Sequence, residues 1–417
     1  MDFLHVLPFA GMLLGIAVVP LLFPHQWERP ATPALLTAAC ALPTLVFAVA
    51  TGRTVEILHG IEEYVAFIVL IAALYITTGG IHVAGNLRAT PLINASYLGV
   101  GAIAASLIGT TGASMLLIRP LLHTNRERQH KTHIVVFFIL VVSNTGGLLT
   151  PLGDPPLYLG YIKGVPFSFT FQLWPAWLLA QAMLLAMFLL WDSRAYARES
   201  RADIERDRRF QRRLQFDGLV NIPIALAIIA ISAAGVPSPW REGLFALLIV
   251  LSLKITPKRA REANGFHTGP LLEVAVLFLG IFITMVPALA ALRVAAPSLP
   301  VDTTSGLFLM TGVLSSLLDN APTYLIFAEL AAERAGFAGD LRALASQAPA
   351  LLAAVSIGAV FMGANTYIGN GPNLLVKAVA EQAGSARVAM PSFFAYAAIA
   401  TITLTPVYIG VLWLILD

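Results

Sequence analysis

Long apolar runs separated by short polar stretches make up almost the whole chain. An α-helix needs about 20 mostly apolar residues to cross a bilayer, and several runs approach or reach that length. The first run follows Met1 and Asp2 with no basic segment before it, so we predict a retained helix and not a cleaved signal. About ten runs are predicted to span: 3–23, 33–50, 64–81, 134–149, 173–190, 219–234, 243–255, 272–289, 351–368 and 393–416.

Two further apolar stretches, 95–122 and 305–330, are interrupted near their middles. The first contains the sequence GTTG at 109–112, and the second contains DNAP at 319–322. Non-helical backbone at membrane depth is tolerated only where protein surrounds it or where it lines a cavity. We therefore predict two re-entrant hairpins, with broken full spans as the alternative.

The polar segment 192–217 divides the chain into two similar halves. Each half is predicted to hold about five spanning helices, a re-entrant hairpin and a discontinuous helix, and TPLGDPP at 150–156 aligns with TYIGNGP at 366–372. Because five spans is an odd number, the second half enters the membrane from the opposite side. The predicted fold is an all-α integral membrane protein with an inverted-topology repeat, 1–191 and 218–417, as in many secondary transporters.

Composition excludes a soluble protein. Hydrophobic residues make up 58% of the chain and charged residues only 12%, and the mean hydropathy is +0.79, whereas a soluble domain is about one quarter charged. The pI near 9.0 does not indicate nucleic-acid binding, because the basic residues lie in loops between apolar spans. A single cysteine, Cys40, excludes internal disulfides and multi-cysteine metal sites.

Charge asymmetry orients the predicted spans. Most of the 26 basic residues fall on one side if the linker 192–217 is cytoplasmic, which predicts an inner (plasma) membrane protein with both termini outside. Six acidic residues mixed with eight arginines favour a solvated connector over a membrane-surface helix in this linker. We interpret His123, His130 and His133 as part of a basic loop on the same side, not as a metal site.

Polar residues of the apolar regions gather at four interruptions. Gly and Pro beside each interruption predict unwound backbone, whose free carbonyl oxygens can coordinate a cation. The alternative for any one residue is a simple kink with a cross-linking Asn or Thr, but ordinary kinks have no reason to recur in both halves. The candidate substrate- and ion-binding residues are Asp154, Asp319, Asn320, Thr323, Asn144, Thr145, Thr150, Asn365, Thr366, Asn370, Thr110 and Thr111.

Two carboxylates, Asp154 and Asp319, lie inside the interruptions. A charge at that depth costs about 2.5 kcal/mol or more on insertion scales, so its default interpretation is functional. A buried carboxyl group can hold either a proton or a sodium ion, and exchange follows from that competition. We predict a sodium site at Asp154, Asp319 and Asn320 and no other cofactor; the alternative for each aspartate is capping the helix that follows it.

At these residues the chain resembles the ion transporter superfamily, specifically the NhaD-type sodium/proton antiporters and the related arsenite and citrate transporter-like proteins. The similarity covers nearly the full length and is most specific at 143–156, 319–323 and 363–366. It implies inverted repeats with two hairpins, a scaffold subdomain that forms a homodimer, and a transport subdomain that moves like an elevator. The positions that the resemblance implies for ion binding are Asp154, Asp319, Asn320 and Thr323.

Sodium/proton antiport is the first functional hypothesis, because two aspartates with no obvious basic partner leave the empty site anionic. Sodium-coupled symport of a di- or tricarboxylate is the alternative, since helix N-termini at the breaks would hold an anion beside the sodium ion. Efflux of arsenite or another oxyanion comes third. A channel is less expected, because pores assemble around one axis and not as inverted repeats.

An enzyme is the hypothesis of a different class. An intramembrane aspartyl enzyme needs its two carboxylates adjacent, about 4 Å apart, whereas Asn, Thr and carbonyl oxygens around a carboxylate favour transport. No Walker A sequence is present, so the chain alone is not expected to use ATP. We predict a non-enzyme whose partners are the lipid bilayer and small inorganic ions or small carboxylates, with Na⁺ and H⁺ as the transported or coupling ions.

Overall fold

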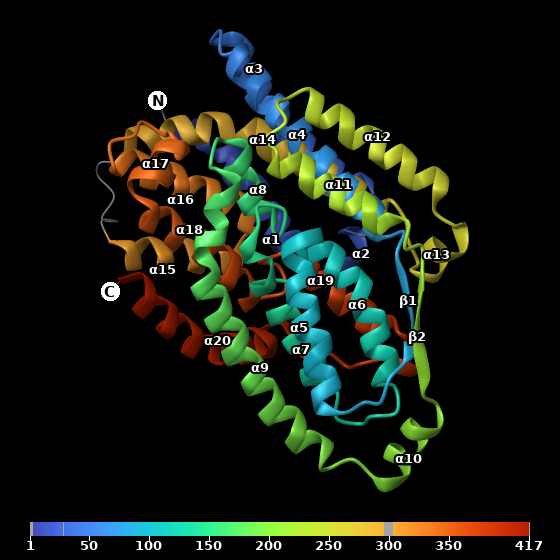
Figure 1. Ribbon diagram of the computed structural model, residues 1–417. Coiled ribbons are helices and arrows are strands. Elements are labelled where there is room, and N and C mark those ends of the chain that lie inside the picture. Colours follow the sequence, from blue (N-terminus) through green and yellow to red (C-terminus); the bar gives the residue numbers. More distant parts are fainter. Residues whose placement is uncertain (1–2, 28, 296–302, 417) are drawn as a thin grey trace.

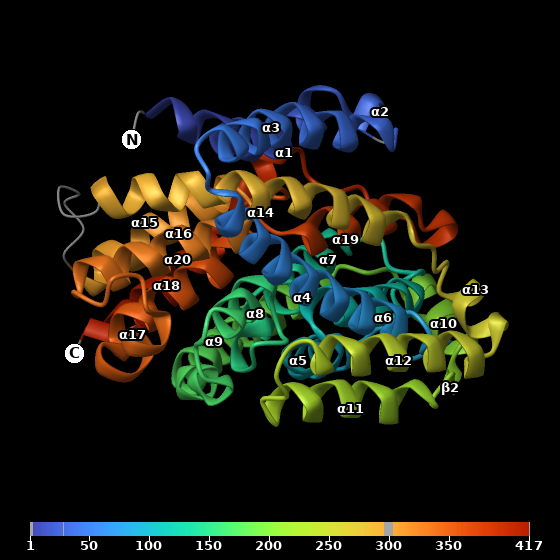
Figure 2. The ribbon, with the colours of Figure 1, turned by 90° about the horizontal axis from the view of Figure 1, so that it is seen from above.

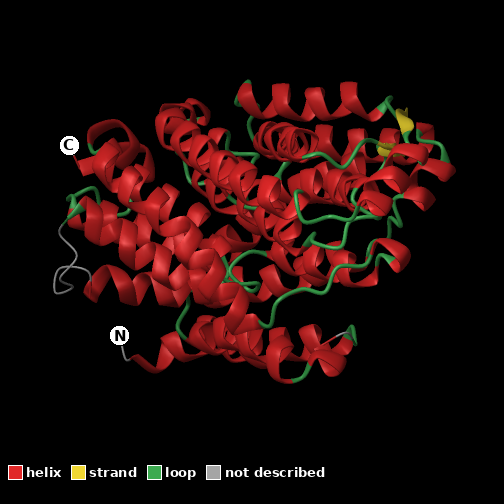
Figure 3. Cartoon of the chain, turned by 90° about the horizontal axis from the view of Figure 1, so that it is seen from below, coloured by secondary structure: helices red, strands yellow, loops and turns green. Residues whose placement is uncertain are grey.

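The described part of the chain is almost entirely helical. The structure, a computed structural model, describes residues 3–27, 29–295 and 303–416, and these contain one two-stranded sheet (Figures 1 and 3). Seven described helices are long and apolar enough to cross a membrane, or eight if α17 and α18, bent by 112°, form one span. These lengths and compositions support a multi-pass, all-α membrane protein. The chain ends, predicted to face outward, lie outside the described residues at 1–2 and 417.

Gly and Pro set the element boundaries that matter most in the first half. Pro91 occupies the first turn of α5, where its missing N–H has no helical acceptor to bond, and the Thr90 side chain caps that turn. Gly109, at φ +83°, separates α5 from α6 in a conformation that disfavours a side chain. The elements are η1 Phe3–Val6, α1 Leu7–Leu22, α2 Pro24–Trp27, α3 Ala31–Ala50, α4 Thr54–Thr78, β1 His82–Asn86, α5 Pro91–Ile108, α6 Thr110–Thr124, α7 Thr132–Val141, η2 Thr145–Leu149, α8 Pro155–Ile162, η3 Phe167–Leu173 and α9 Trp174–Tyr196.

The second half has a similar order of elements after the linker. Here α15 ends before extended Leu318, and α19 begins at Gly371-Pro372, so both interruptions fall where the sequence predicts them. The elements are α10 Arg201–Arg209, β2 Arg212–Asp217, α11 Asn221–Ala233, α12 Trp240–Ile255, α13 Lys258–Ala263, α14 Gly269–Ala295, α15 Thr304–Leu317, α16 Asn320–Arg334, α17 Leu341–Gln347, α18 Pro349–Met362, η5 Gly363–Asn365, α19 Gly371–Gln382, η6 Gly384–Ala386 and α20 Phe393–Leu416.

The ten predicted spans differ in length. Six of them lie in the helices of spanning length, and α5, predicted as a hairpin arm, is the seventh. The helices α1 and α11 are shorter apolar helices, and α12 covers 16 residues. The runs 134–149 and 351–368 are not continuous α-helices, because α7 ends at Val141 and α18 at Met362. The two arms of each predicted hairpin, α5 with α6 and α15 with α16, pack against each other, as a hairpin requires.

The helices separate into two groups. The first helix group consists of the early helices of both halves, which contact one another: α1, α3, α4, α11, α12 and α14. The second group, the hairpin group, consists of the two hairpins, the broken helices, α9 and α20. Figure 2 shows α1 to α3 along one side, α11 and α12 along the opposite side, and α4 and α14 between them. Helices α4 and α14 pack directly against α6, α8 and α16, so they connect the two groups.

Most residues of the linker 192–217 are exposed, as a solvated connector requires, but the linker also contains a helix and a strand. The hydroxyl of Ser200 caps α10 by accepting from the backbone N–H of Asp203 at 3.1 Å. Strand β2 then pairs with β1 in an antiparallel β1–β2 ribbon, with His82 opposite Asp217 (Figure 1). Asp207 fastens α10 to the start of the first hairpin, because its carboxylate accepts from the backbone N–H of Ala89.

Candidate functional site

The two broken segments of the first half meet at Asp154. Pro155 and Pro156 begin α8, and Asp154 precedes them in an extended conformation without capping the helix. The hairpin tip lies against this break, because the backbone N–H of Thr110 donates to the Gly153 carbonyl at 2.8 Å. A Cβ on Gly153 would overlap the carbonyl oxygen of Gly147. The close packing of two breaks therefore depends on glycine.

The second half repeats this arrangement. Gly363 and Gly369 make the counterpart close approach with the same spacing, and Asn370 occupies the position that corresponds to Asp154. In each half a hairpin serine donates to a carbonyl of the break, and a threonine of the break donates to the carbonyl of that serine. These bonds run from Ser106 to Gly146 and Thr150 to Ser106, and from Ser316 to Met362 and Thr366 to Ser316.

Asp154 accepts hydrogen bonds from neutral side chains of both halves. Its Oδ1 accepts from Thr110 Oγ1 at 2.8 Å and from Asn370 Nδ2 at 3.2 Å. Its Oδ2 accepts from Asn320 Nδ2 at 2.6 Å. Asp154 is 1% exposed, and no basic side chain of the described residues bonds to it. By the criterion stated above, Thr and Asn donors around this carboxylate favour transport over aspartyl catalysis.

Four helix N-termini converge on this carboxylate. Thr110 and Asn320 are the first residues of α6 and α16, whereas Asp154 and Asn370 directly precede α8 and α19. Their hydrogen bonds bring the four ends within one side-chain length. Because each helix N-terminus carries about half a positive charge, this convergence stabilises the buried carboxylate and favours a further anion beside it.

Asp319 lies differently from Asp154. Its side chain is only partly buried, and its Oδ1 accepts from the backbone N–H of Ala321 at 3.0 Å, which caps α16. Within the described residues its carboxylate makes no hydrogen bond to Asp154 or Asn320. The structure therefore brings Asp154 and Asn320 together, while Asp319 adopts the capping geometry given above as the alternative.

The other predicted residues mainly hold the breaks in shape. Thr323 donates to the carbonyl of Asp319, one helical turn earlier, and Thr111 lines a cavity beside Asp154. Asn144 is close to the centre, because its Oδ1 accepts from Asn370. The side chains of four more predicted residues form hydrogen bonds with partners other than Asp154. Thr145 bonds to the Leu140 carbonyl and to Gln181, and Asn365 bonds to Ser316 and Tyr408. Thr150 and Thr366 donate to the carbonyls of Ser106 and Ser316.

Three important residues were not among the predicted ones. Asn373 donates to the carbonyls of Gly363 and Thr366, both at 2.9 Å, and accepts from Asn144 at 2.7 Å. Ser106 and Ser316 make the paired bonds described above. A signal for the serines existed, because Ser-Leu-Ile and Ser-Leu-Leu precede the two breaks at equivalent positions.

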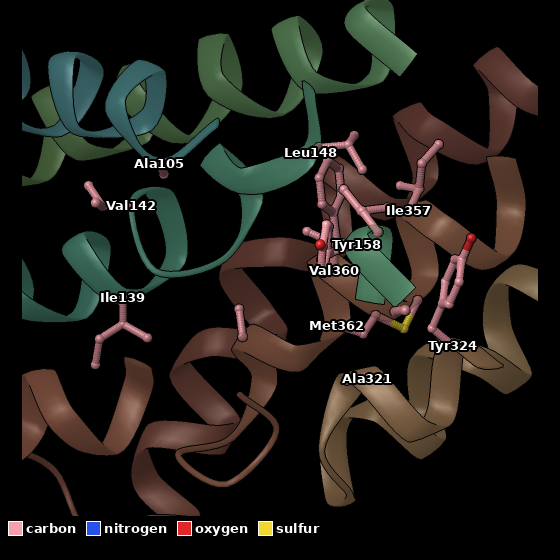
Figure 4. Close-up of a cluster of buried hydrophobic side chains, with 14 of the residues drawn as sticks. Ala105, Ile139, Val142, Leu148, Tyr158, Ala321, Tyr324, Ile357, Val360 and Met362 are labelled. Atoms are coloured by element: carbon pink, nitrogen blue, oxygen red, sulfur yellow. The ribbon is translucent and has the colours of Figure 1, made fainter. Parts of the chain in front are cut away.

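Apolar packing closes one side of the site. Figure 4 shows Tyr158 of α8, Ala321 and Tyr324 of α16, and Ile357 and Val360 of α18 in one cluster. All five are at most 1% exposed. This cluster keeps water away from the breaks, and interactions of Asp154 are stronger in such surroundings than in water.

A small cavity lies on the other side of Asp154, against the first helix group. It measures about 40 Å³ and is lined by Leu70, Leu74 and Tyr75 of α4 and by Thr110 to Gly112 of the hairpin. A cavity needs about 10–15 Å³ on this measure to hold a water molecule, so this space fits a water molecule or a small ion. It does not fit a di- or tricarboxylate in this conformation.

The histidine loop contains a buried ionic network around Asp192. The His133 imidazole lies 2.8 Å from Asp192, and Arg128 lies 2.7 Å from the same carboxylate. Asn94 donates to the other oxygen of Asp192 at 3.0 Å. Arg128 and Asp192 are 4% and 0% exposed. The network fastens α5, the loop before α7 and α9, and its partners are too distant in sequence for spacing to reveal them.

Comparison with known proteins gives one family. A family model described as putative citrate transport matches residues 1–416, which is almost the entire chain. The search of curated proteins finds no match. Together with the spanning helices, the family match supports a membrane-embedded secondary transporter of a small molecule, and it favours a transporter over an enzyme.

Proposed function

Because the chain belongs to the putative citrate transport family, we propose that it is a secondary transporter that moves a di- or tricarboxylate together with a cation. The observation that carries this proposal is the convergence of four helix N-termini on Asp154, with neutral donors around it. The helix ends favour an anionic substrate, while the carboxylate repels it. A cation on Asp154 removes that repulsion.

Coupling follows from this electrostatic balance. An ionised Asp154 and a carboxylate substrate cannot occupy the same low-dielectric site without a compensating charge. A proton or a sodium ion on Asp154, with Asn320 and backbone carbonyls as further ligands and Asp319 as a second carboxylate nearby, supplies it. The anion and the cation then bind together and leave together.

The proposal includes an architecture for movement. We propose that 1–191 and 218–417 are inverted repeats joined by the cytoplasmic linker 192–217, in an inner-membrane homodimer. The paired serine and threonine bonds of the two halves support the repeat. The hairpin group would slide along α4 and α14 and open the cavity at Asp154 to each side in turn.

Uptake of labelled citrate into proteoliposomes tests this function. An inward sodium or proton gradient is imposed, and the wild type is compared with Asp154→Asn and Asp319→Asn. We expect gradient-driven uptake by the wild type and nearly complete loss in both variants. Asparagine at 319 still caps α16, so a normal rate in that variant would limit Asp319 to capping. Absence of carboxylate uptake under every gradient would refute the proposal.

Sodium/proton antiport is the second candidate. It is favoured by the absence of a basic side chain bonded to Asp154 among the described residues, which leaves the unliganded site anionic. The same vesicles, loaded with a pH-sensitive dye, test it without any carboxylate present. Sodium-induced proton movement that disappears in Asp154→Asn would establish exchange, and no response from about pH 6 to 9 would exclude it.

A further inference from the structure

A second, larger cavity lies at the opposite end of the helices that begin at Asp154. Its volume is about 860 Å³, and it lies between the C-terminal ends of α6 and α19 and the β1–β2 ribbon. Helices α6 and α19 contact each other and both start at the site. Nine residue steps separate Thr110 from Arg119 and rise about 14 Å along α6, which sets the distance between the site and the cavity.

The walls of this cavity are basic. Arg119 comes from α6, and Arg212 and Arg213 come from β2, with His82 and His123 nearby. None of the described residues that line the cavity carries a carboxylate. Figure 1 shows the β1–β2 ribbon running along α6, which brings the arginines of the linker to this end of the hairpin group.

The arginines of the cavity are not neutralised by nearby acids. Among the described residues, no carboxylate forms an ion pair with Arg119, Arg212 or Arg213. Two acids of the adjoining segments have other partners, because Glu127 pairs with Arg126 at 2.8 Å and Glu381 pairs with Lys377 at 2.8 Å. Three exposed guanidinium groups therefore share one concave surface, which concentrates anions.

We propose that this cavity is a vestibule that binds the polyvalent anionic substrate on the linker side before it reaches Asp154. The proposal rests on the proposed function for the identity of the anion, a di- or tricarboxylate. Guanidinium groups suit this ligand because each can hold a carboxylate through two parallel hydrogen bonds. Gln382 and Ser385, which also line the cavity, supply neutral donors. The volume accommodates a hydrated tricarboxylate, which the cavity of about 40 Å³ beside Asp154 does not.

Thiol modification measures the charge of the vestibule without requiring transport. Gln215 lines the cavity, and Cys40 is the only native cysteine, so Gln215→Cys in a Cys40→Ser background gives one reporter thiol. An anionic sulfonate and a cationic trimethylammonium methanethiosulfonate are compared, each relative to a free thiol. At low ionic strength we expect the anionic reagent to be favoured about tenfold, and the preference to fall at high salt.

Two charge-removal variants of the Gln215→Cys reporter test whether the cavity arginines cause the preference for the anionic reagent. Arg212→Gln with Arg213→Gln should abolish the preference. Arg208→Gln with Arg209→Gln removes the same charge from α10, outside the cavity, and should leave it unchanged. Citrate should slow the reaction of the thiol with both reagents in the Arg208 and Arg209 control, but not in the Arg212 and Arg213 variant. Equal rates for the two reagents in the parent reporter would overturn the vestibule.

Transport kinetics connect the vestibule to the substrate. In vesicles sorted by orientation, the Arg212 and Arg213 double variant should raise KM for citrate several-fold at low salt, only for movement from the linker side, with kcat unchanged. The failures are distinguishable. A basic vestibule in the thiol assay without carboxylate transport would refute the proposed function alone, whereas normal transport with an unchanged KM would refute a role in substrate binding.

Discussion

Replacing Asp154 tests whether its hydrogen bonds and its charge have separate roles. In Asp154→Ala, the Thr110 hydroxyl and the Asn320 amide lose the only side-chain acceptor that either has among the described residues. The Asn370 amide keeps the Ser143 carbonyl and Asn144 as acceptors. Two unpaired buried donors, at about 1–3 kcal/mol each, predict a loss of about 2–6 kcal/mol in the free energy of unfolding.

Asp154→Asn should behave differently because the surrounding side chains can adapt. The new amide keeps one oxygen for Thr110 and Asn370, while its nitrogen faces Asn320. The Oδ1 of Asn320 is buried and has no hydrogen-bond partner among the described residues, and a flip of that amide presents it as an acceptor to the new nitrogen. We therefore expect Asp154→Asn to match the wild type within about 1 kcal/mol, yet to lose coupled transport because the charge is gone.

Thermal unfolding in detergent, followed beside gradient-driven citrate uptake, checks this reasoning. The expected order of midpoints places the wild type and Asp154→Asn together and Asp154→Ala clearly below them. Equal midpoints for the two variants would show that the Thr110 and Asn320 donors do not depend on this carboxylate. Coupled uptake by Asp154→Asn would show that the charge is not needed, and the mechanism would then fail whatever the stability.

Three further substitutions test other parts of the structure. Gly153→Ala should destabilise by about 1–3 kcal/mol in thermal unfolding, because its Cβ meets backbone, while Gly371→Ala, whose Cβ meets nothing, should not; equal effects would contradict the close approach. Asp192→Asn should cost about 3–5 kcal/mol in the same assay by leaving Arg128 poorly compensated, and a neutral result would mean that the network is solvated. Burial raises the pKa of Asp207 above its usual 3.8, so its ionisation in the folded state costs stability as pH rises through that range. The stability of Asp207→Asn relative to the wild type should therefore increase from pH 4 towards 7, and a constant difference would contradict the shift.

The positions of the breaks could be predicted from the sequence, and the bonds between them could not. Gly, Pro and Asp inside apolar runs are locally incompatible with a continuous membrane helix, so the interruptions at 109–112 and 319–322 are visible without a structure. The bond from Asn320 to Asp154 joins residues 166 positions apart, and no local pattern encodes it. The different environments of Asp154 and Asp319 arise for the same reason.

The exposure of the linker could be predicted from its sequence, and its ordered structure could not. Its mixed charges favour solvent when they are counted, but their partners lie elsewhere in the chain, such as Ala89 for Asp207. The alternation of Leu214 and Phe216 in β2 was an available sign of a strand. Composition alone averages over that alternation and therefore missed the ribbon.

The β1–β2 ribbon also sets how the two helix groups can move. The connection from α4 to the first hairpin and the connection from α10 to α11 are hydrogen-bonded to each other, so neither can bend alone. Both leave the first helix group at one point, where Gly218, at φ +72°, packs against the carbonyl of Gly80 so closely that a Cβ would overlap it. Any sliding of the hairpin group would turn both connections about this single pivot, and the length of the ribbon would limit its travel.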